Sequence, residues 1–238
     1  MQSSTPIDLG PARELELALL IADLSGYTAL TETHGALHAS EVVLRFQRLA
    51  GASLEPGVAI VNSIGDDVFF AGADTLAVVR TALRLRDSVA RETDYPRVRT
   101  GVHRGLIVER EGRFFGTPIN LTARLAADAD GGQILCTNPI AEAIGALAEI
   151  EANPVGERRF KNFAHPVAVF ELARVSERRA ASVIDPVCRM QIPVGGAATT
   201  ARHVGRTYYF CSLECASLFQ DAPDVYADRG RGREERDR

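Results

Sequence analysis

The sequence lacks features that mark several large classes of protein. Its 238 residues include 27 Lys and Arg against 31 Asp and Glu, a formal net charge of -4. It therefore lacks the basic surplus of a general nucleic-acid-binding protein. No basic segment followed by an apolar one opens the chain, and no apolar run reaches the ~18 residues of a membrane-spanning helix. We expect no signal peptide, no membrane span and a cytoplasmic location.

Cysteine is scarce and unevenly placed. Only four cysteines are present, and without an export signal we expect them to be reduced. Three of them, Cys188, Cys211 and Cys215, lie in the last quarter of the chain, which predicts a small separate module there. The rest of the composition, 46% hydrophobic and 24% charged, is that of a globular protein with a real core.

The order of apolar patterns predicts an α+β domain, with a sheet covered by helices. Charged or polar segments at residues 1–14, 176–182 and 229–238 are predicted to be a loose leader, a linker and a flexible tail. We expect strands over residues 15–22, 57–72 (a hairpin), 97–112 (a strand pair), 131–137 and 159–175, and helices over residues 26–52 (broken near Gly35), 74–92 and 117–129.

Two aspartates stand where apolar strand patterns end. In "ALLIADLSGYTAL" (18–30) an apolar run leads directly to Asp23, and Asp66 falls in the turn of the predicted hairpin "GVAIVNSIGDDVFFAG". Each alone has a structural explanation, because Asp commonly caps a following helix and Gly-Asp is common in turns. Brought together, the two carboxylates could hold Mg²⁺ or Mn²⁺. The amides of Gly26, Tyr27 and Thr28 at the next helix start could cradle substrate phosphates.

A third polar pattern lies in "FGTPINLTARL" (115–125). Asn120 and Arg124 are four residues apart, so they share one face of the predicted helix. A pair of this kind is most often a solvated surface pair. Aimed at a nucleotide, the amide could orient the ribose, and the guanidinium could neutralise charge on the phosphates in the transition state.

Four segments resemble, in order, the successive motifs of the class III nucleotidyl cyclase catalytic domain. They are "LLIADLSGYTAL", "VNSIGDDVFFAG", "VRTGVHRGLIVEREGRFFGTPINLTARLAADADGGQILCT" and "VGERRFKNFAHPVAVFEL". The resemblance implies a ferredoxin-like α+β domain over residues 15–175, whose active sites form between two chains of a dimer, here expected to be a homodimer. It also implies that Asp23 and Asp66 bind the metal and that Asn120 and Arg124 act from the partner chain.

The base-recognition positions depart from the family pattern. Adenylate-forming members place a lysine where this chain has Asn62 and an aspartate where it has Arg113. Asn62 can still donate and accept a hydrogen bond, whereas Arg113 can only donate, so it cannot accept from the adenine amino group. The pair of residues usual in guanylate-forming members is missing too. ATP is therefore expected over GTP by family frequency alone.

The C-terminal segment "VIDPVCRMQIPVGGAATTARHVGRTYYFCSLECASLFQDAPDVY" (183–226) carries the three clustered cysteines. A helix over residues 213–220 would place Cys215 on its first turn and Cys211 just before it. Three thiolates suit Zn²⁺ or Cu(I), and a module this small often needs a metal to fold. The alternative is three buried, reduced cysteines that act as small hydrophobic residues.

The same segment resembles the YHS domain, a small treble-clef-like metal-binding module, here over residues 183–228. The match rests on "DPVCRM" and "GRTYYFCSLECASLF", and it implies that Cys188, Cys211 and Cys215 bind a transition metal, zinc or copper. His203 is a weak fourth candidate. Arg189 stands where glycine is usual, which is tolerable if that turn avoids positive φ. Cys136 is interpreted as core packing. The histidines without metal-ligand spacing are interpreted as structural or surface residues: His34, His38, His103 and His165.

These patterns together predict a nucleotidyl cyclase that forms a cyclic nucleotide and pyrophosphate from a nucleoside triphosphate, with a metal-binding YHS module that tunes the dimer. The principal alternative is a regulatory protein that binds nucleotide or metal without turnover. The substitutions at Asn62 and Arg113 favour this alternative, and the joint presence of Asp23, Asp66, Asn120 and Arg124 argues against it. An interaction scaffold is a third hypothesis, with no specific support.

Overall fold

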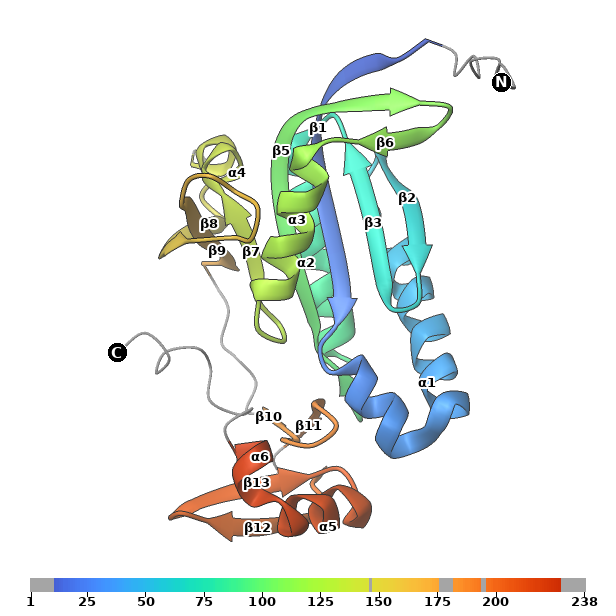
Figure 1. The fold of residues 1–238 in the computed structure, drawn as a ribbon, viewed down its shortest axis with the longest axis vertical. Coiled ribbons are helices and arrows are strands. Elements are labelled where there is room, and N and C mark those ends of the chain that lie inside the picture. The colour runs from blue at the N-terminus through green and yellow to red at the C-terminus, as the bar shows by residue number, and fades with distance from the viewer. Residues whose placement is uncertain (1–10, 146, 176–181, 194–195, 228–238) are drawn as a thin grey trace, which may run out of the picture.

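The computed structural model describes residues 11–145, 147–175, 182–193 and 196–227 (Figure 1). The predicted leader, linker and tail lie mostly or wholly outside these residues. Among the described residues, no helix is both long and apolar enough to cross a membrane.

The centre of the molecule is an antiparallel sheet with a ferredoxin-like order, β2-β3-β1-β5. Helix α1 connects β1 to β2, and α2 lies between β3 and β5 in the chain (Figure 1). The α+β prediction is confirmed. The elements are β1 (Arg13–Leu24), α1 (Tyr27–Ala52), β2 (Val58–Ile64), β3 (Asp67–Gly72), α2 (Thr75–Ala90) and β5 (Val98–Arg110).

The sheet continues beyond β5 through a parallel pairing with β7, then through β9 to β8. The predicted strand pair at residues 97–112 is wrong, because β5 is one long strand whose hairpin partner is the short β6. The apolar pattern at residues 159–175 forms a strand only from Val167, and neither α4 nor β8 was predicted. These elements are β6 (Arg113–Phe115), α3 (Thr117–Asp128), β7 (Ile134–Thr137), α4 (Asn138–Ile144), β8 (Ile150–Arg158) and β9 (Val167–Arg174).

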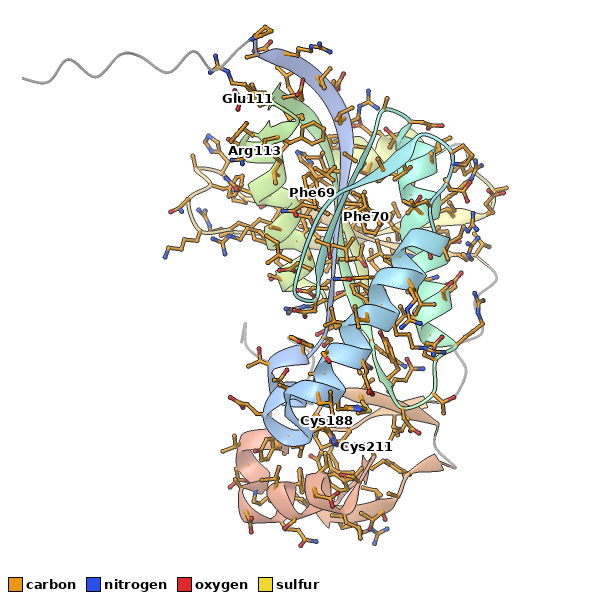
Figure 2. The ribbon with its side chains drawn as sticks, turned by 90° about the vertical axis from the view of Figure 1, so that its right-hand side faces the viewer. Phe69, Phe70, Glu111, Arg113, Cys188 and Cys211 are labelled. Carbon is orange, nitrogen blue, oxygen red and sulfur yellow. The ribbon has the colours of Figure 1, made fainter. Side chains whose placement is uncertain are left out.

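Strand alternation sends the residues of β1 to two different faces of the sheet. Leu20 and Ala22 belong to the main core, under α1 and α2, whereas Leu19 belongs to a small cluster on the opposite face. Helix α3 packs on that opposite face, and it can approach because Gly101 has no side chain. A Cβ on Gly101 would lie 2.3 Å from the carbonyl oxygen of Thr122. Figure 2 shows the same alternation in β3, where Phe69 and Phe70 point to opposite sides.

Helix α1 is broken at Gly35, as predicted. Gly35 has φ 80° and ψ 161°, a backbone conformation that only glycine adopts readily. The break separates a short segment, residues 27–34, from the long amphipathic helix that covers the sheet. His34 is the last residue before the break, so its direction is set by the short segment.

The C-terminal module packs against the end of the molecule toward which β1 runs (Figure 1). Its strand β11 pairs with β4, a two-residue strand just before β5, and so extends a small sheet across the two parts of the chain. A helix begins just after Cys211, as predicted. The elements are β4 (Tyr95–Pro96), β10 (Ser182–Ile184), β11 (Met190–Pro193), β12 (Thr199–His203), β13 (Arg206–Phe210), α5 (Leu213–Asp221) and α6 (Pro223–Ala227).

Candidate functional site

Asp23 lies at the end of β1 on the face that carries α3, and only 8% of its surface is exposed. It does not cap α1, because the N-cap is Gly26 and no side chain accepts a hydrogen bond there. Its direct partner is Arg99, which stands opposite it on β5. The guanidinium Nε donates to one carboxylate oxygen, and Nη2 donates to the other at 2.9 Å. Sequence analysis did not find this pair, because it joins two strands that are far apart in the chain.

Two further carboxylates adjoin Asp23 at the β2–β3 turn. The pKa of Asp66 is raised to about 6, mainly by burial and in part by the negative charges of Asp23 and Asp67. The pKa of Asp23 is also raised, mainly by burial, although Arg99 opposes that shift. Burial raises the pKa of Asp67 as well. Three carboxylates lie close together beside one arginine. A divalent cation bound among them would reduce their mutual repulsion.

A pocket of about 360 Å³ opens beside these carboxylates. Asp23, Asn62 and Asp67 supply its polar lining, while Asp66 is outside the lining. Its apolar walls come from β1, from the β2–β3 hairpin and from one side of α3. The complete lining is Ile21, Asp23, Asn62, Ile64, Asp67, Val68, Phe69, Ala123, Ala126 and Ala127.

Gly26, Tyr27 and Thr28 form the start of α1, immediately after Asp23 and its neighbours. Gly26 has φ 84°, and the first turn of the helix contains no acidic residue. The N–H groups of this turn therefore have no side-chain acceptor from a cap, which suits an anion. These amides therefore lie close to Asp23 in the chain, at the turn that joins β1 to α1.

Asn120 and Arg124 are both exposed on α3, as their spacing predicts. Within the part of the chain that the structure describes, no hydrogen bond or ion pair joins them to Asp23, Asp66 or Asp67. One chain therefore gathers the carboxylates but leaves the helical Asn and Arg facing solvent.

Asn62 and Arg113 are placed apart. Asn62 lines the pocket beside Asp23, and its Oδ1 accepts a hydrogen bond from the Ser63 N–H at 2.8 Å. Arg113 is exposed on β6, at the end of the molecule away from Cys188 and Cys211 (Figure 2). No described contact joins the two residues within one chain.

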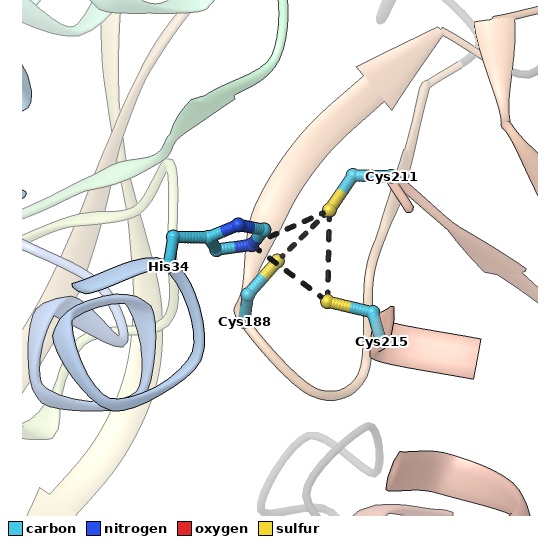
Figure 3. A group of neighbouring side chains, drawn as sticks. All are labelled: His34, Cys188, Cys211 and Cys215. Atoms are coloured by element: carbon cyan, nitrogen blue, oxygen red, sulfur yellow. Dashed lines mark hydrogen bonds between the residues drawn. The ribbon is translucent and has the colours of Figure 1, made fainter. Parts of the chain in front are cut away.

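A second cluster forms where the C-terminal module meets the rest of the chain. Cys188 lies in the turn between β10 and β11, Cys211 directly follows β13, and Cys215 lies in the first turn of α5. Ser212 caps α5 by accepting from the Cys215 N–H at 3.2 Å. The Sγ atom of Cys211 lies 3.3 Å from that of Cys188 and 3.7 Å from that of Cys215 (Figure 3).

Asp185, fully buried, holds the segments that carry the first two of these cysteines. Its Oδ1 accepts from the N–H groups of Val187 at 2.8 Å and Cys188 at 3.3 Å, and its Oδ2 accepts from the Cys211 N–H at 2.8 Å. The carboxylate therefore fixes the separation of Cys188 and Cys211. Sequence analysis did not identify this role.

The fourth member of the cluster is His34, which the sequence analysis treated as a structural or surface residue. That interpretation is wrong. Its Nε2 lies 3.9 Å from the Cys211 Sγ and 3.8 Å from the Cys215 Sγ (Figure 3). His203, the candidate named from sequence, is elsewhere: its Nε2 lies 3.0 Å from an Asp224 carboxylate oxygen, and its ring packs on Phe219.

The donor set of this cluster fits a metal that prefers sulfur and imidazole nitrogen. One ligand atom from each of the four residues lies within 4.8 Å of all the others. Hydrogen bonds from Cys188 and Cys211 lower the pKa of Cys215, so this thiol is the first to become a thiolate. Cys136, by contrast, is buried in β7, and burial raises its pKa to about 12. The prediction that Cys136 is core packing is confirmed.

Known proteins resemble both the larger N-terminal part of the chain and its C-terminal module. The pH-sensitive adenylate cyclase MT1302 of Mycobacterium tuberculosis is 31% identical over 170 residues, which cover 70% of this chain and 42% of that protein. The chain therefore spans less than half the length of that relative. The YHS domain family model matches residues 183–229.

Solved cyclase structures share the fold. The adenylyl cyclase CyaB of P. aeruginosa superposes with a TM-score of 0.61 at 20% identity, over 71% of this chain and 98% of that one. The guanylyl cyclase Cya2 gives a TM-score of 0.60 at 21% identity, over 70% and 95% of the two chains. The chain thus combines a domain of the class III nucleotidyl cyclase fold, related in sequence to adenylate cyclases, with a C-terminal YHS domain.

Proposed function

We propose that this protein is a nucleotidyl cyclase that converts a nucleoside triphosphate, ATP by expectation, into a cyclic nucleotide and pyrophosphate. The observation that carries the proposal is the grouping of Asp23, Asp66 and Asp67 beside a pocket and next to the uncapped start of α1. The adenylate cyclase relatives and the shared cyclase fold support the same activity.

Each candidate site residue has a proposed role that follows from its chemistry. Asp23 and Asp66 would hold Mg²⁺ or Mn²⁺, which supplies charge neutralisation on the phosphates and lowers the pKa of the attacking 3′-hydroxyl. Arg99 opposes the rise in the pKa of Asp23 and holds the carboxylate in place, and it leaves the second lone pair of each carboxylate oxygen available for another contact. The amides of Gly26, Tyr27 and Thr28 would bind phosphate oxygens. Asn120 would orient the ribose, and Arg124 would stabilise transition-state charge.

The active site is proposed to lie between two copies of the chain. Asn120 and Arg124 are exposed and stand apart from the carboxylates of their own chain, so a second copy would bring the missing pair to each site. The pocket is also bordered by apolar side chains that a partner would cover, since Ile64 is 70% exposed and Ile21 and Phe69 share its lining. A homodimer would therefore contain two equivalent sites.

One observation favours the alternative of nucleotide binding without turnover. The Asn62 amide oxygen already accepts a hydrogen bond from its own strand, and Arg113 lies on a different hairpin. Arg113 offers no acceptor to the adenine amino group, and Asn62 could offer it only the remaining lone pair of its amide oxygen. Under this alternative the phosphate-binding residues would remain but the base would be held too loosely for reaction.

The deciding experiment is cyclic-nucleotide production by the purified chain, with ATP and GTP supplied separately in Mn²⁺. Product from either nucleotide, absent in Asp66→Ala, would establish the activity and the base. If neither nucleotide gave product while nucleotide still bound, the proposal would be replaced by the regulatory alternative.

The shared-site proposal has its own test. Asp66→Ala and Arg124→Ala should each be inactive, but an equal mixture should recover about a quarter of wild-type activity, because half of the dimers are mixed and each holds one intact site. Two samples of the same variant, mixed in the same way, are the control. A mixture that stays inactive after subunit exchange is demonstrated would contradict a site built from two chains.

A further inference from the structure

The two parts of the chain are joined by backbone pairing close to the candidate active site. Gln191 of β11 stands opposite Tyr95 of β4. The Arg97 Nε donates a hydrogen bond to the side-chain oxygen of Gln191 at 2.8 Å. Two residues further along, β5 presents Arg99 to Asp23. The YHS domain is therefore anchored on the segment that leads directly into β5, the strand whose Arg99 positions the candidate catalytic carboxylate.

A second contact reaches the start of α1. A Cβ on Gly26 would lie 2.4 Å from the Cβ of Arg189, so the turn of the YHS domain rests directly on the first residue of the helix cap. Arg189 itself has φ 67°, so the turn does not meet the condition under which arginine would replace glycine there without strain. A non-glycine residue in this region costs about 1 kcal/mol, so the surrounding packing must hold it.

His34 is the third contact, at the other end of the same short segment. Residues 27–34 run from the Gly26 cap to the break at Gly35, and the imidazole at the end of this segment enters the cysteine cluster. The segment is thus contacted by Arg189 at Gly26, just before its first residue, and by the Cys211 and Cys215 sulfur atoms at its last residue, His34.

The distances within the cluster are close to those of a tetrahedral zinc site. Zn–S bonds of about 2.3 Å and Zn–N bonds of about 2.0–2.1 Å give edges of about 3.8 Å between sulfur atoms and about 3.6 Å between sulfur and nitrogen. Two of the three sulfur–sulfur separations are 3.3 and 3.7 Å, and two of the three sulfur–nitrogen separations are 3.9 and 3.8 Å. The other two pairs, Cys188–Cys215 and Cys188–His34, lie within 4.8 Å. Small shifts of side chains would therefore place all four donors around one ion.

We propose that His34 is the fourth ligand of a Cys₃His zinc site that the two domains share. Zn²⁺ is the ion this donor set selects, since three thiolates with one imidazole form a closed structural site, whereas Cu(I) would be satisfied by thiolates alone. Zinc binding would tie residues 27–34 of the catalytic domain to the YHS domain. The YHS domain is then a zinc-dependent clamp on the start of α1.

The clamp acts next to the groups that would bind substrate. Asp23 and the amides of Gly26, Tyr27 and Thr28 directly precede or begin the clamped segment, so zinc occupancy would restrict their motion. This consequence for catalysis rests on the proposed cyclase function. The zinc site itself does not, because its ligands are separate from Asp23, Asp66, Asn120 and Arg124.

The first test measures zinc binding by the full-length chain under reducing conditions, with a chromophoric chelator as competitor. Wild type should bind one zinc per chain, and His34→Ala should bind it about 100-fold or more weakly. His34→Cys should recover tight binding as a Cys₄ site. His38→Ala is the matched control, since its ring lies 5.6 Å from that of His34 but outside the cluster; it should bind zinc as wild type does.

Cobalt supplies a second readout that does not depend on affinity. Co²⁺ in the wild-type chain should show the intense visible bands of a tetrahedral thiolate site, and these should shift in both His34→Ala and His34→Cys. Unchanged zinc affinity and an unchanged cobalt spectrum in His34→Ala would overturn the proposal and leave a site built by the YHS domain alone. Tight Cu(I) binding that ignores His34, with no zinc binding, would overturn it too.

The clamp is tested by hydrogen exchange of the same samples. Amides of residues 27–34 should exchange more slowly with zinc than without it in wild type, and this difference should vanish in His34→Ala. Equal exchange with and without zinc in wild type would overturn the clamp. None of these measurements of zinc binding, cobalt spectra and hydrogen exchange uses nucleotide. A chain that makes no cyclic nucleotide can therefore still give the expected results, and an active cyclase can fail to give them.

Discussion

The Nε2 of His34 lies 3.8 Å from the Sγ of Cys215, although 181 positions separate the two residues in the chain. One belongs to the first helix of the cyclase-fold domain and the other to a helix of the YHS domain. The contact places the candidate metal cluster at the boundary between the domains, at the end of the helical segment that begins beside the candidate active site. It gives a physical route by which a metal in one domain can affect the other.

Asp23 should be needed both for activity and for stability. Asp23→Ala should abolish cyclic-nucleotide formation and lower the free energy of unfolding by about 2 kcal/mol, because it leaves the partly buried Arg99 without its partner. The double variant Asp23→Ala/Arg99→Met should regain part of that stability and remain inactive. Denaturant unfolding and the cyclase assay on the same samples check this. An activity loss no greater than the loss of folded protein would contradict a role for Asp23 in the reaction.

Asp185 should control metal affinity without touching the metal. Asp185→Asn replaces an accepting oxygen with an N–H₂ group that faces backbone donors, so the segments bearing Cys188 and Cys211 should separate. Zinc affinity should fall about 10- to 100-fold, as for other residues that orient metal ligands. Chelator competition measures the change, and Asp221→Asn, exposed at the end of α5, is the control. Equal affinities in both variants would show that the cysteines hold their positions unaided.

Gly101 should be essential for the packing of α3. In Gly101→Ala the new methyl group would lie 2.3 Å from the Thr122 oxygen and 2.5 Å from the Ala126 nitrogen, both backbone atoms that cannot move alone. We expect a loss of about 2 kcal/mol or more. Gly51→Ala adds the same group to α1 where nothing lies within 4 Å, and it should stabilise by about 0.5–1 kcal/mol. Thermal unfolding measures both variants. Equal changes in stability in Gly101→Ala and Gly51→Ala would contradict the packing argument.

His103 should make the fold sensitive to acid. Burial lowers its pKa to about 4, and its Nδ1 lies 2.7 Å from the Thr137 hydroxyl. Since an unfolded histidine titrates near 6.5, the unfolded chain takes up the proton first as the pH falls. His103 therefore contributes a loss of stability between about pH 6.5 and 4, with a slope of up to about 1.4 kcal/mol per pH unit.

The His103 contribution is isolated by comparing unfolding free energies at pH 7 and pH 5. His103→Asn should flatten this part of the profile, whereas His165→Asn, at an exposed position, should leave it unchanged. A profile that is equally steep in His103→Asn would assign the acid sensitivity to other groups.

Local sequence patterns determined most of the secondary structure and part of the sites. Apolar runs marked β1 and the β2–β3 hairpin, and Gly35 marked the break in α1, because these signals act over a few residues. The cysteines at the start of α5 were found the same way. The strand pair at residues 97–112 was misjudged, since the polar residues of β5 suggested a turn where the sheet instead continues.

Tertiary structure alone decided which distant groups meet. Nothing near His34 in the sequence distinguishes it from a surface histidine, and Asp23 and Arg99 are separated by 76 positions. These contacts follow from the burial of apolar faces, as where β4 meets β11 and α3 meets β5. Burial sets the relative positions of whole elements, and the positions of their polar side chains follow from it. The sequence by itself therefore determined the two kinds of candidate site, carboxylate and cysteine, whereas the packing of the domains decided that a histidine of the cyclase-fold domain lies beside the cysteines.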